Sequence, residues 1–312
     1  MTAPQFPGVG VARGHYESFY LRAADPDGGR SVWIRHTVHK RPGEAPNGAL
    51  WCTLFDAARP GPRAVKQSLA DPRAAEWVEL GPSHFGPSAA RGQAEALGRL
   101  AAWDLRFGPS PEPLRHLPAE RLYLTPLPRT KTESPLPDTT VTGWVELDGD
   151  RWELDAWRGM VGHNWGSEHA ERWIWLHGVG FEDAPDAWLD VALGRVRIGP
   201  VTTPWLANGA LHVDGRRRRL GGLRRAQVSE RPDGAEIDLG ALQITVSAPL
   251  EQLVSWPYAD PGGGEHRSTN CSIAAIELRV DGRTLRTAHG GAWELGTREA
   301  PVGVEAQPFP DP

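Results

Sequence analysis

The stretch VTGWVELDGDRWELDAW (residues 141–157) contains the pattern that decides the fold class. Apolar and polar side chains alternate on both sides of the Asp148-Gly149 pair. Asp-Gly favours the two-residue type I′ turn of a β-hairpin, because both central residues of that turn take a positive φ. The stretch therefore predicts two antiparallel strands joined by a tight turn.

The same signal recurs along the chain. Asp-Gly pairs stand at 27–28, 214–215, 233–234 and 281–282, most of them between strand-like flanks. Residues 31–39 also alternate, so that Ile34 and His36 share one face while Trp33 and Arg35 share the other. Residues 88–102 are rich in alanine, which favours a helix, but their internal glycines weaken one and we expect a strand. The chain is predicted to be all-β and hairpin-rich.

A proline-rich segment at 108–140 interrupts this pattern, with prolines at 109, 111, 113, 118, 126, 128, 135 and 137. Proline removes a ladder hydrogen bond and is excluded from sheet interiors. The segment is therefore predicted to be a surface connection between two halves. We place the domains at 1–125 and 126–312.

Composition narrows the class of protein. The 312 residues are 39% hydrophobic and 23% charged, enough for a sizeable core. A net charge of −5 argues against a nucleic-acid partner. No apolar run is long enough for a transmembrane segment, and the first residues lack signal-peptide features, so a cytoplasmic protein is expected. Cys52 and Cys271 have no metal-type spacing and are expected to be free thiols.

Tryptophan is unusually abundant, with 14 Trp against 7 Phe and 4 Tyr. Several of these residues gather in GMVGHNWGSEHAERWIWLHG (residues 159–178), together with three histidines. Trp173, Trp175 and His177 alternate, so on a strand they project to one face. Each buried imidazole and indole N–H needs a partner, which makes this composition a poor choice for an inert core.

Three interpretations of this segment compete. A metal site would use His163, His169 and His177, with Glu168 as a further ligand, but the spacing matches no established zinc pattern. A structural interpretation makes the tryptophans core residues and the histidines turn formers. We favour a third, in which they line an apolar ligand cavity with a few convergent polar groups. The sequence thus predicts no metal and no cofactor.

The segment MVGHNWGSEHAERWIWLHG (residues 160–178) is similar to the NWG…WxW signature of tocopherol cyclases. It also resembles the corresponding segment of hydroxyneurosporene synthases (carotenoid 1,2-hydratases) and of AttH-like proteins, a lipocalin-like, calycin-type group. GHYESFY (residues 14–20) looks like the opening motif of the same group, so the resemblance covers roughly 14–290. It implies two consecutive lipocalin-like antiparallel barrels or sandwiches.

The chain departs from these families beside the Asn-Trp-Gly core. Gly162-His163 precedes the core where tocopherol cyclases carry an acidic residue or lysine, and Glu168-His169 replaces their Phe-Pro. Hydratases favour an acidic residue beside their histidine, where this chain has Asn164. The resemblance therefore implies the fold more firmly than any one reaction.

Enzymes of this group protonate an alkene or close a ring in a dry pocket, which needs a buried acid and aromatic faces. The resemblance then implies a hydrophobic small-molecule ligand, isoprenoid or polyketide-like, and cofactor-independent, acid-assisted cyclisation, hydration or isomerisation. A non-catalytic carrier or sensor of an apolar ligand is the alternative. The candidate acids are Glu17, His163 and Glu168. The candidate ligand-binding residues are Arg35 (for an anionic head group), Asn164, Trp165, His169, Trp173, Trp175, His177 and Asn270.

Overall fold

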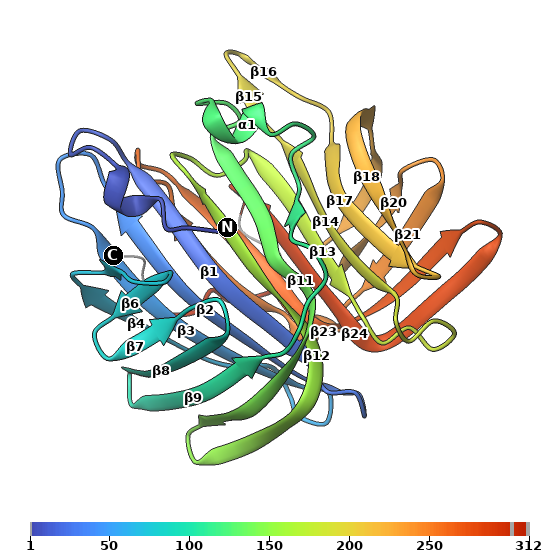
Figure 1. Cartoon of the computed structure of the whole chain (residues 1–312), viewed down its shortest axis with the longest axis horizontal. Helices are drawn as coiled ribbons and strands as arrows, with labels where there is room; N and C mark the ends of the chain where they lie inside the picture. Colours follow the sequence, from blue (N-terminus) through green and yellow to red (C-terminus); the bar gives the residue numbers. More distant parts are fainter. Residues whose placement is uncertain (1, 300–302, 310–312) are drawn as a thin grey trace.

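The computed structural model describes residues 2–299 and 303–309, and strands dominate them (Figure 1). Two large antiparallel sheets curl into half-barrels, which confirms the all-β, two-sheet prediction. The first sheet runs in the order β4-β3-β2-β1-β12-β11-β9-β8-β7-β6-β5, with β10 paired to β11. Its strands are β1 His15–Ala24, β2 Arg30–Lys40, β3 Asn47–Asp56, β4 Arg63–Ala70, β5 Arg73–Ala74, β6 Val78–Leu80, β7 Ser83–Phe85, β8 Ala89–Ala96, β9 Arg99–Phe107, β10 Leu114–Arg115, β11 Thr130–Leu147 and β12 Asp150–Gly166.

The second sheet runs in the order β18-β17-β14-β13-β24-β23-β21-β20-β19, with β22 paired to β23. Its strands are β13 Arg172–Gly178, β14 Trp188–Arg195, β17 Leu206–Val213, β18 Arg216–Arg225, β19 Gln227–Arg231, β20 Gly234–Asp238, β21 Leu242–Ser247, β22 Val254–Ala259, β23 Glu265–Val280 and β24 Arg283–Thr297. A separate hairpin pairs β15 Arg197–Ile198 with β16 Val201–Thr202, at the same end of the molecule as the helix α1 Arg121–Leu124 (Figure 1). Two short 3-10 helices are η1 Phe6–Gly8 and η2 Leu250–Gln252.

The predicted tight turns are present. Asp148 and Gly149 both have positive φ, 54° and 83°, and join β11 to β12. The Asp-Gly pairs at 214–215 and 281–282 do the same for β17–β18 and β23–β24. Residues 88–102, expected to form a strand and not a helix, form β8 and the start of β9, with a turn at Leu97 and Gly98 that the prediction did not include.

The prediction for the proline-rich segment was wrong at residues 114–115 and 130–140, which form strands of the first sheet. Residues 130–140 belong to β11 and pair there with β12 and, at Glu133 and Ser134, with β10. Pro135 and Pro137 fall where the β11–β12 register shifts, between Glu133 and Leu136 and again between Leu136 and Thr139. A bulge leaves a backbone N–H unpaired, so proline costs nothing there. The chain changes sheet between β12 and β13, later than the domain boundary predicted at 125/126.

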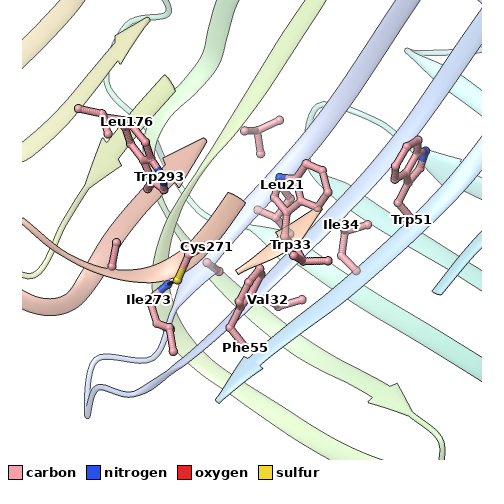
Figure 2. Close-up of a cluster of buried hydrophobic side chains, with 14 of the residues drawn as sticks. Leu21, Val32, Trp33, Ile34, Trp51, Phe55, Leu176, Cys271, Ile273 and Trp293 are labelled. Carbon is pink, nitrogen blue, oxygen red and sulfur yellow. Dashed lines mark hydrogen bonds between the residues drawn. The ribbon is translucent and has the colours of Figure 1, made fainter. Parts of the chain in front are cut away.

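The two sheets share one hydrophobic core. Leu21 and Ile34 of the first sheet lie in the same buried cluster as Ile273 and Trp293 of the second (Figure 2). Cys52 and Cys271 are both buried and unpaired, as expected. Within the described part of the chain, no helix is long and apolar enough to cross a bilayer.

Candidate functional site

A cavity of about 540 Å³ lies between the two sheets. The first sheet contributes Tyr16, Tyr20, Trp33 and Arg35, and the second contributes Trp173, Trp175 and Tyr258. Leu122 and Leu127, in and after α1, and Ile198 of the β15 strand add apolar surface. Such a volume suits a drug-sized molecule, and a mainly apolar lining with a few polar groups is typical of small-molecule sites.

Six of the residues selected from the sequence line this cavity. They are Arg35, Asn164, Glu168, His169, Trp173 and Trp175. Glu17, His163, Trp165, His177 and Asn270 are not among its lining residues. The alternation of a strand explains the split on β12, because Asn164 faces the cavity while its neighbours His163 and Trp165 point to the other face. His177 lies further along β13, where its Nδ1 is 3.3 Å from a guanidinium nitrogen of the buried Arg22.

His169 stands in the loop that carries the chain from the first sheet to the second. Its Nδ1 is 2.8 Å from Oδ1 of Asp260, and its backbone N–H donates to the same oxygen at 2.9 Å. Its ring stacks on Tyr16, with the centroids 4.0 Å apart. The Asp260 contact fixes the proton on Nδ1 and leaves Nε2 with a lone pair, and Nε2 has no hydrogen-bond partner among the described residues.

The pKa values of both His169 and Asp260 are lowered. Burial lowers the pKa of His169, and the opposing influence of Asp260 does not restore it. Burial alone would raise the pKa of Asp260, but the hydrogen bonds from His169 and the proximity of His266 hold it well below its usual range. At neutral pH the pair is a neutral imidazole oriented by a carboxylate, which is the arrangement of a general base.

His266 extends the pair. Its Nδ1 is 3.3 Å from Oδ2 of Asp260, and Arg298 lies 3.5 Å from the same oxygen. Ligand atoms of His169, Asp260 and His266 lie within 4.8 Å of one another, so the three could also hold a metal ion. This is not the set considered from the sequence, because Asp260 and His266 lie some ninety residues beyond the Trp-rich segment and join it only through the fold.

Two tryptophans of β13 form the cavity wall, and acidic side chains hold them. Trp173 donates its indole N–H to Glu294 at 2.9 Å, and Trp175 donates to Asp190 at 3.1 Å. Asp190 is fully buried and also pairs with His116, whose pKa is raised because this carboxylate outweighs burial. Hydrogen bonds therefore hold both tryptophan rings in place before a ligand binds.

Glycines make room for the aromatic rings of the wall. A Cβ at Gly296 would lie 2.0 Å from the ring of Trp173, and one at Gly162 would lie 2.1 Å from the ring of Tyr20. The sequence predicted neither of these contacts.

Gly296→Ala is expected to push the Trp173 ring from its place, because its added methyl overlaps that ring. Overpacking of this kind costs about 1–3 kcal/mol in the free energy of unfolding and should also weaken ligand binding. Urea unfolding and ligand titration measure the two effects. Gly262→Ala is the matched control, since a Cβ there meets nothing within 4 Å. Equal behaviour of the two variants would show that the close approach does not position Trp173.

Glu17 and His163 form a separate buried cluster with Glu133. His163 Nε2 lies 2.8 Å from Glu17, and its Nδ1 lies 3.2 Å from Glu133. Glu17 also accepts the backbone N–H groups of Gln5 and Phe6, which fixes the N-terminal segment. Burial opposes ionisation of Glu17, but hydrogen bonds from His15 and His163 lower its pKa to about 2. A carboxyl group that is ionised at neutral pH does not suit the predicted acid role.

Glu168 reaches the cavity, but it is engaged at the mouth. Its carboxylate pairs with Arg129 and lies 3.8 Å from Arg298, and about a third of its side chain is exposed. Among the described residues, Asn270 makes no side-chain hydrogen bond; it pairs with Val254 across β22 and β23. The sequence did not single out Tyr16, Tyr20, Tyr258 or Asp260. Only the first two left a signal, as residues four apart on one face of β1.

No protein-family model matches the chain. In sequence it is similar to an uncharacterised protein of Mycobacterium tuberculosis, Rv0493c in strain H37Rv and MT0513 in strain CDC 1551. The identity is 28% over 316 residues, covering 95% of this chain and 91% of the relative.

Solved structures match over nearly the whole chain. An AttH-like protein of Nitrosomonas europaea aligns with a TM-score of 0.53 at 14% identity, covering 95% of this chain and 97% of that one. Kievitone hydratase of Nectria haematococca aligns with a TM-score of 0.56 at 9% identity, covering 92% and 89%. At these identities the likeness establishes the fold. The chain thus has the lipocalin-like, two-sheet fold of AttH-like and hydratase structures, as the resemblance of residues 160–178 implied.

Proposed function

We propose that this protein binds an apolar small molecule of isoprenoid or polyketide type in the inter-sheet cavity and catalyses the addition or removal of water without a cofactor. His169 is the proton-transfer residue. The observation that carries the proposal is the His169–Asp260 pair, in which His169 lines a mainly apolar cavity and its partner Asp260 is buried. Kievitone hydratase, a structural neighbour, supports hydration as the reaction class on the level of fold analogy.

The proposed step uses His169, Asp260 and one water molecule. Nε2 of His169 takes a proton from a water molecule, and the resulting hydroxide adds to one carbon of a polarised C=C bond. The imidazolium then returns its proton to the other carbon, so the net change is one added water. Asp260 stays ionised throughout and stabilises the imidazolium that forms transiently. Elimination of water is the same path in reverse.

A route through a strong acid and a carbocation has less support. The carboxyl group of Glu17 has a pKa of about 2 and is not part of the cavity lining, and that of Glu168 is paired with Arg129. The aromatic wall would still stabilise a positive charge on the ligand. Because neither glutamate suits the role of the acid, cyclisation or isomerisation would need His169 in its protonated form.

A non-catalytic carrier is the second candidate. The mainly apolar lining is sufficient to bind an apolar ligand, and a carrier would need no proton transfer by His169. Turnover separates the two candidates.

The first experiment follows Trp emission while prenylated quinols, carotenoid precursors and fatty acids are added. Saturable quenching is expected for one class, and Trp175→Phe should reduce it because Trp175 lines the cavity. Trp165→Phe is the matched control on the other face of β12 and should leave the response intact. No saturable response from folded protein would contradict the cavity proposal.

Compounds that bind are then incubated with the protein and analysed by mass spectrometry. A gain or loss of one water identifies the enzyme, whereas binding without any mass change supports the carrier. The assay is repeated after chelator treatment. Activity that disappears and returns with a divalent metal would assign His169, Asp260 and His266 to a metal site instead of an acid–base pair.

A further inference from the structure

Arg35 lies in the cavity wall, and no acidic side chain of the described residues forms an ion pair with it. It projects from β2, and only 6% of the residue is exposed. Its Nε donates to Ser18 Oγ at 2.5 Å. Its two terminal guanidinium nitrogens make no hydrogen bond or ion pair with any residue that the structure describes.

The other cations of the cavity differ from Arg35. Arg129 pairs with Glu168, and Arg197 pairs with Glu171, so the charges at the mouth are matched. A buried charge without a counter-ion has a high desolvation free energy. Proteins therefore pair such a charge with an acidic side chain or place it where a bound ligand pairs with it. Among the described lining residues, Arg35 is therefore the arginine for which a ligand would have to supply the counter-ion.

Aromatic faces hold the guanidinium in one orientation. Its Cζ lies 4.5 Å from the ring centroid of Tyr258, 5.2 Å from that of Trp51 and 5.7 Å from that of Trp33. Cation–π contacts of this kind hold the guanidinium in place without using its N–H donors. The free donors therefore remain available as a fork, the geometry that a carboxylate matches with two parallel hydrogen bonds.

We propose that the otherwise apolar substrate carries one carboxylate, which binds Arg35 while the apolar body lies against the aromatic wall. The inference rests on the proposed function, because it concerns the occupant of the same cavity. The body covers an apolar surface supplied by Trp173 and Trp175 of β13 and by Leu122, Leu127 and Ile198.

Arg35 and His169 lie around the same aromatic ring, that of Tyr258. Its centroid is 4.5 Å from the guanidinium carbon of Arg35 and 5.8 Å from the centroid of the His169 ring. Arg35 is also one of the charges that lower the pKa of His169, after burial and the neighbouring His266. In this proposal, a double bond conjugated to the carboxylate is the bond on which His169 acts. Arg35 would stabilise the negative charge that develops on the carboxylate oxygens when hydroxide adds at the far carbon.

The test uses two fluorescent probes that differ in one charge. 8-Anilinonaphthalene-1-sulfonate is anionic, and N-phenyl-1-naphthylamine has the same rings without the sulfonate. The wild-type protein is expected to bind the anionic probe about tenfold more tightly, the effect of one charge-assisted hydrogen-bonded pair. Arg35→Gln should abolish that preference, so that the two probes bind the variant with similar affinity.

Arg30→Gln is the matched control. Arg30 lies on the same strand and over two tryptophan rings, but its guanidinium is paired with Asp25. This variant should keep the wild-type preference. A second measurement needs no variant: naphthalene-2-carboxylate should displace the neutral probe from wild-type protein at lower concentration than naphthalene-2-carboxamide.

The outcomes separate the two proposals. Equal affinity for both probes, or a preference that survives Arg35→Gln, would overturn the anionic substrate and leave the cavity intact. Failure of the neutral probe to bind folded wild-type protein would overturn the cavity itself, and the carboxylate inference with it. Should Arg35→Gln not fold, the carboxylate and carboxamide pair decides alone.

Discussion

His169→Gln is expected to lower the turnover number by about a hundred- to ten-thousandfold, the usual contribution of a general acid–base residue. Ligand affinity should change little, because glutamine fills similar space and the aromatic wall is untouched. Steady-state turnover of the compound found by Trp quenching, together with its dissociation constant, measures both. His289→Gln is the control, since His289 is exposed and remote from the cavity lining.

The pH profile carries a second signature of His169. Burial lowers its pKa below the ordinary value of 6.5, so the base form is already present at neutral pH. Activity should therefore hold steady as the pH falls from 7 and drop only when His169 becomes protonated, below 6.5. Asp260→Asn should weaken catalysis without removing binding, and it should move that drop to still lower pH, because the carboxylate favours the imidazolium.

Normal turnover in His169→Gln would remove this residue from the mechanism. Loss of binding along with turnover would instead make it part of the ligand-binding wall, as a ring stacked on Tyr16.

The sequence predicted the hairpins well because their information is local. Asp148 and Gly149 need only their own conformational preferences to turn β11 into β12. Alternation along β13 likewise placed Trp173 and Trp175 on one face, which is the cavity face. Periodicity thus specifies which residues share a face.

Periodicity does not specify which face meets the cavity. His163 and Asn164 are neighbours in the richest motif of the chain, yet Asn164 lines the cavity and His163 lies between two buried glutamates. The partner of His169 was out of reach for another reason. Asp260 joins it from a loop after β22 in the second sheet, and no local pattern connects residues so far apart.

Glu17→Gln is expected to reduce the free energy of unfolding by about 3–5 kcal/mol, the usual cost of breaking a buried ion pair by removing one partner. The change removes the countercharge of His163 and weakens the bonds that hold the N-terminal segment. Urea unfolding at pH 6 measures it. Glu168→Gln is the matched control, because a partly exposed pair with Arg129 contributes only about 0–1 kcal/mol.

The pH dependence follows from the two pKa shifts. The pKa of Glu17 is lowered from 4.5 to about 2, so its contribution is complete above 4.5 and is lost as the pH falls towards 2. Hydrogen bonds with Glu133 and Glu17 outweigh burial and raise the pKa of His163 above 6.5. Its contribution is complete below 6.5 and is lost as the pH rises through the higher, folded-state value. The cluster therefore stabilises the fold most between about pH 4.5 and 6.5.

The stability difference between wild type and Glu17→Gln should shrink when measured at pH 3, where the wild-type pair has lost part of its contribution. Turnover per folded molecule should stay near the wild-type value, since Glu17 is not part of the cavity lining. The opposite pattern, intact stability with abolished turnover, would make Glu17 the acid that the family resemblance implied. In that case the ligand would have to reach the space between β1 and η1 instead of the cavity beside His169, and the N-terminal segment would have to open to admit it.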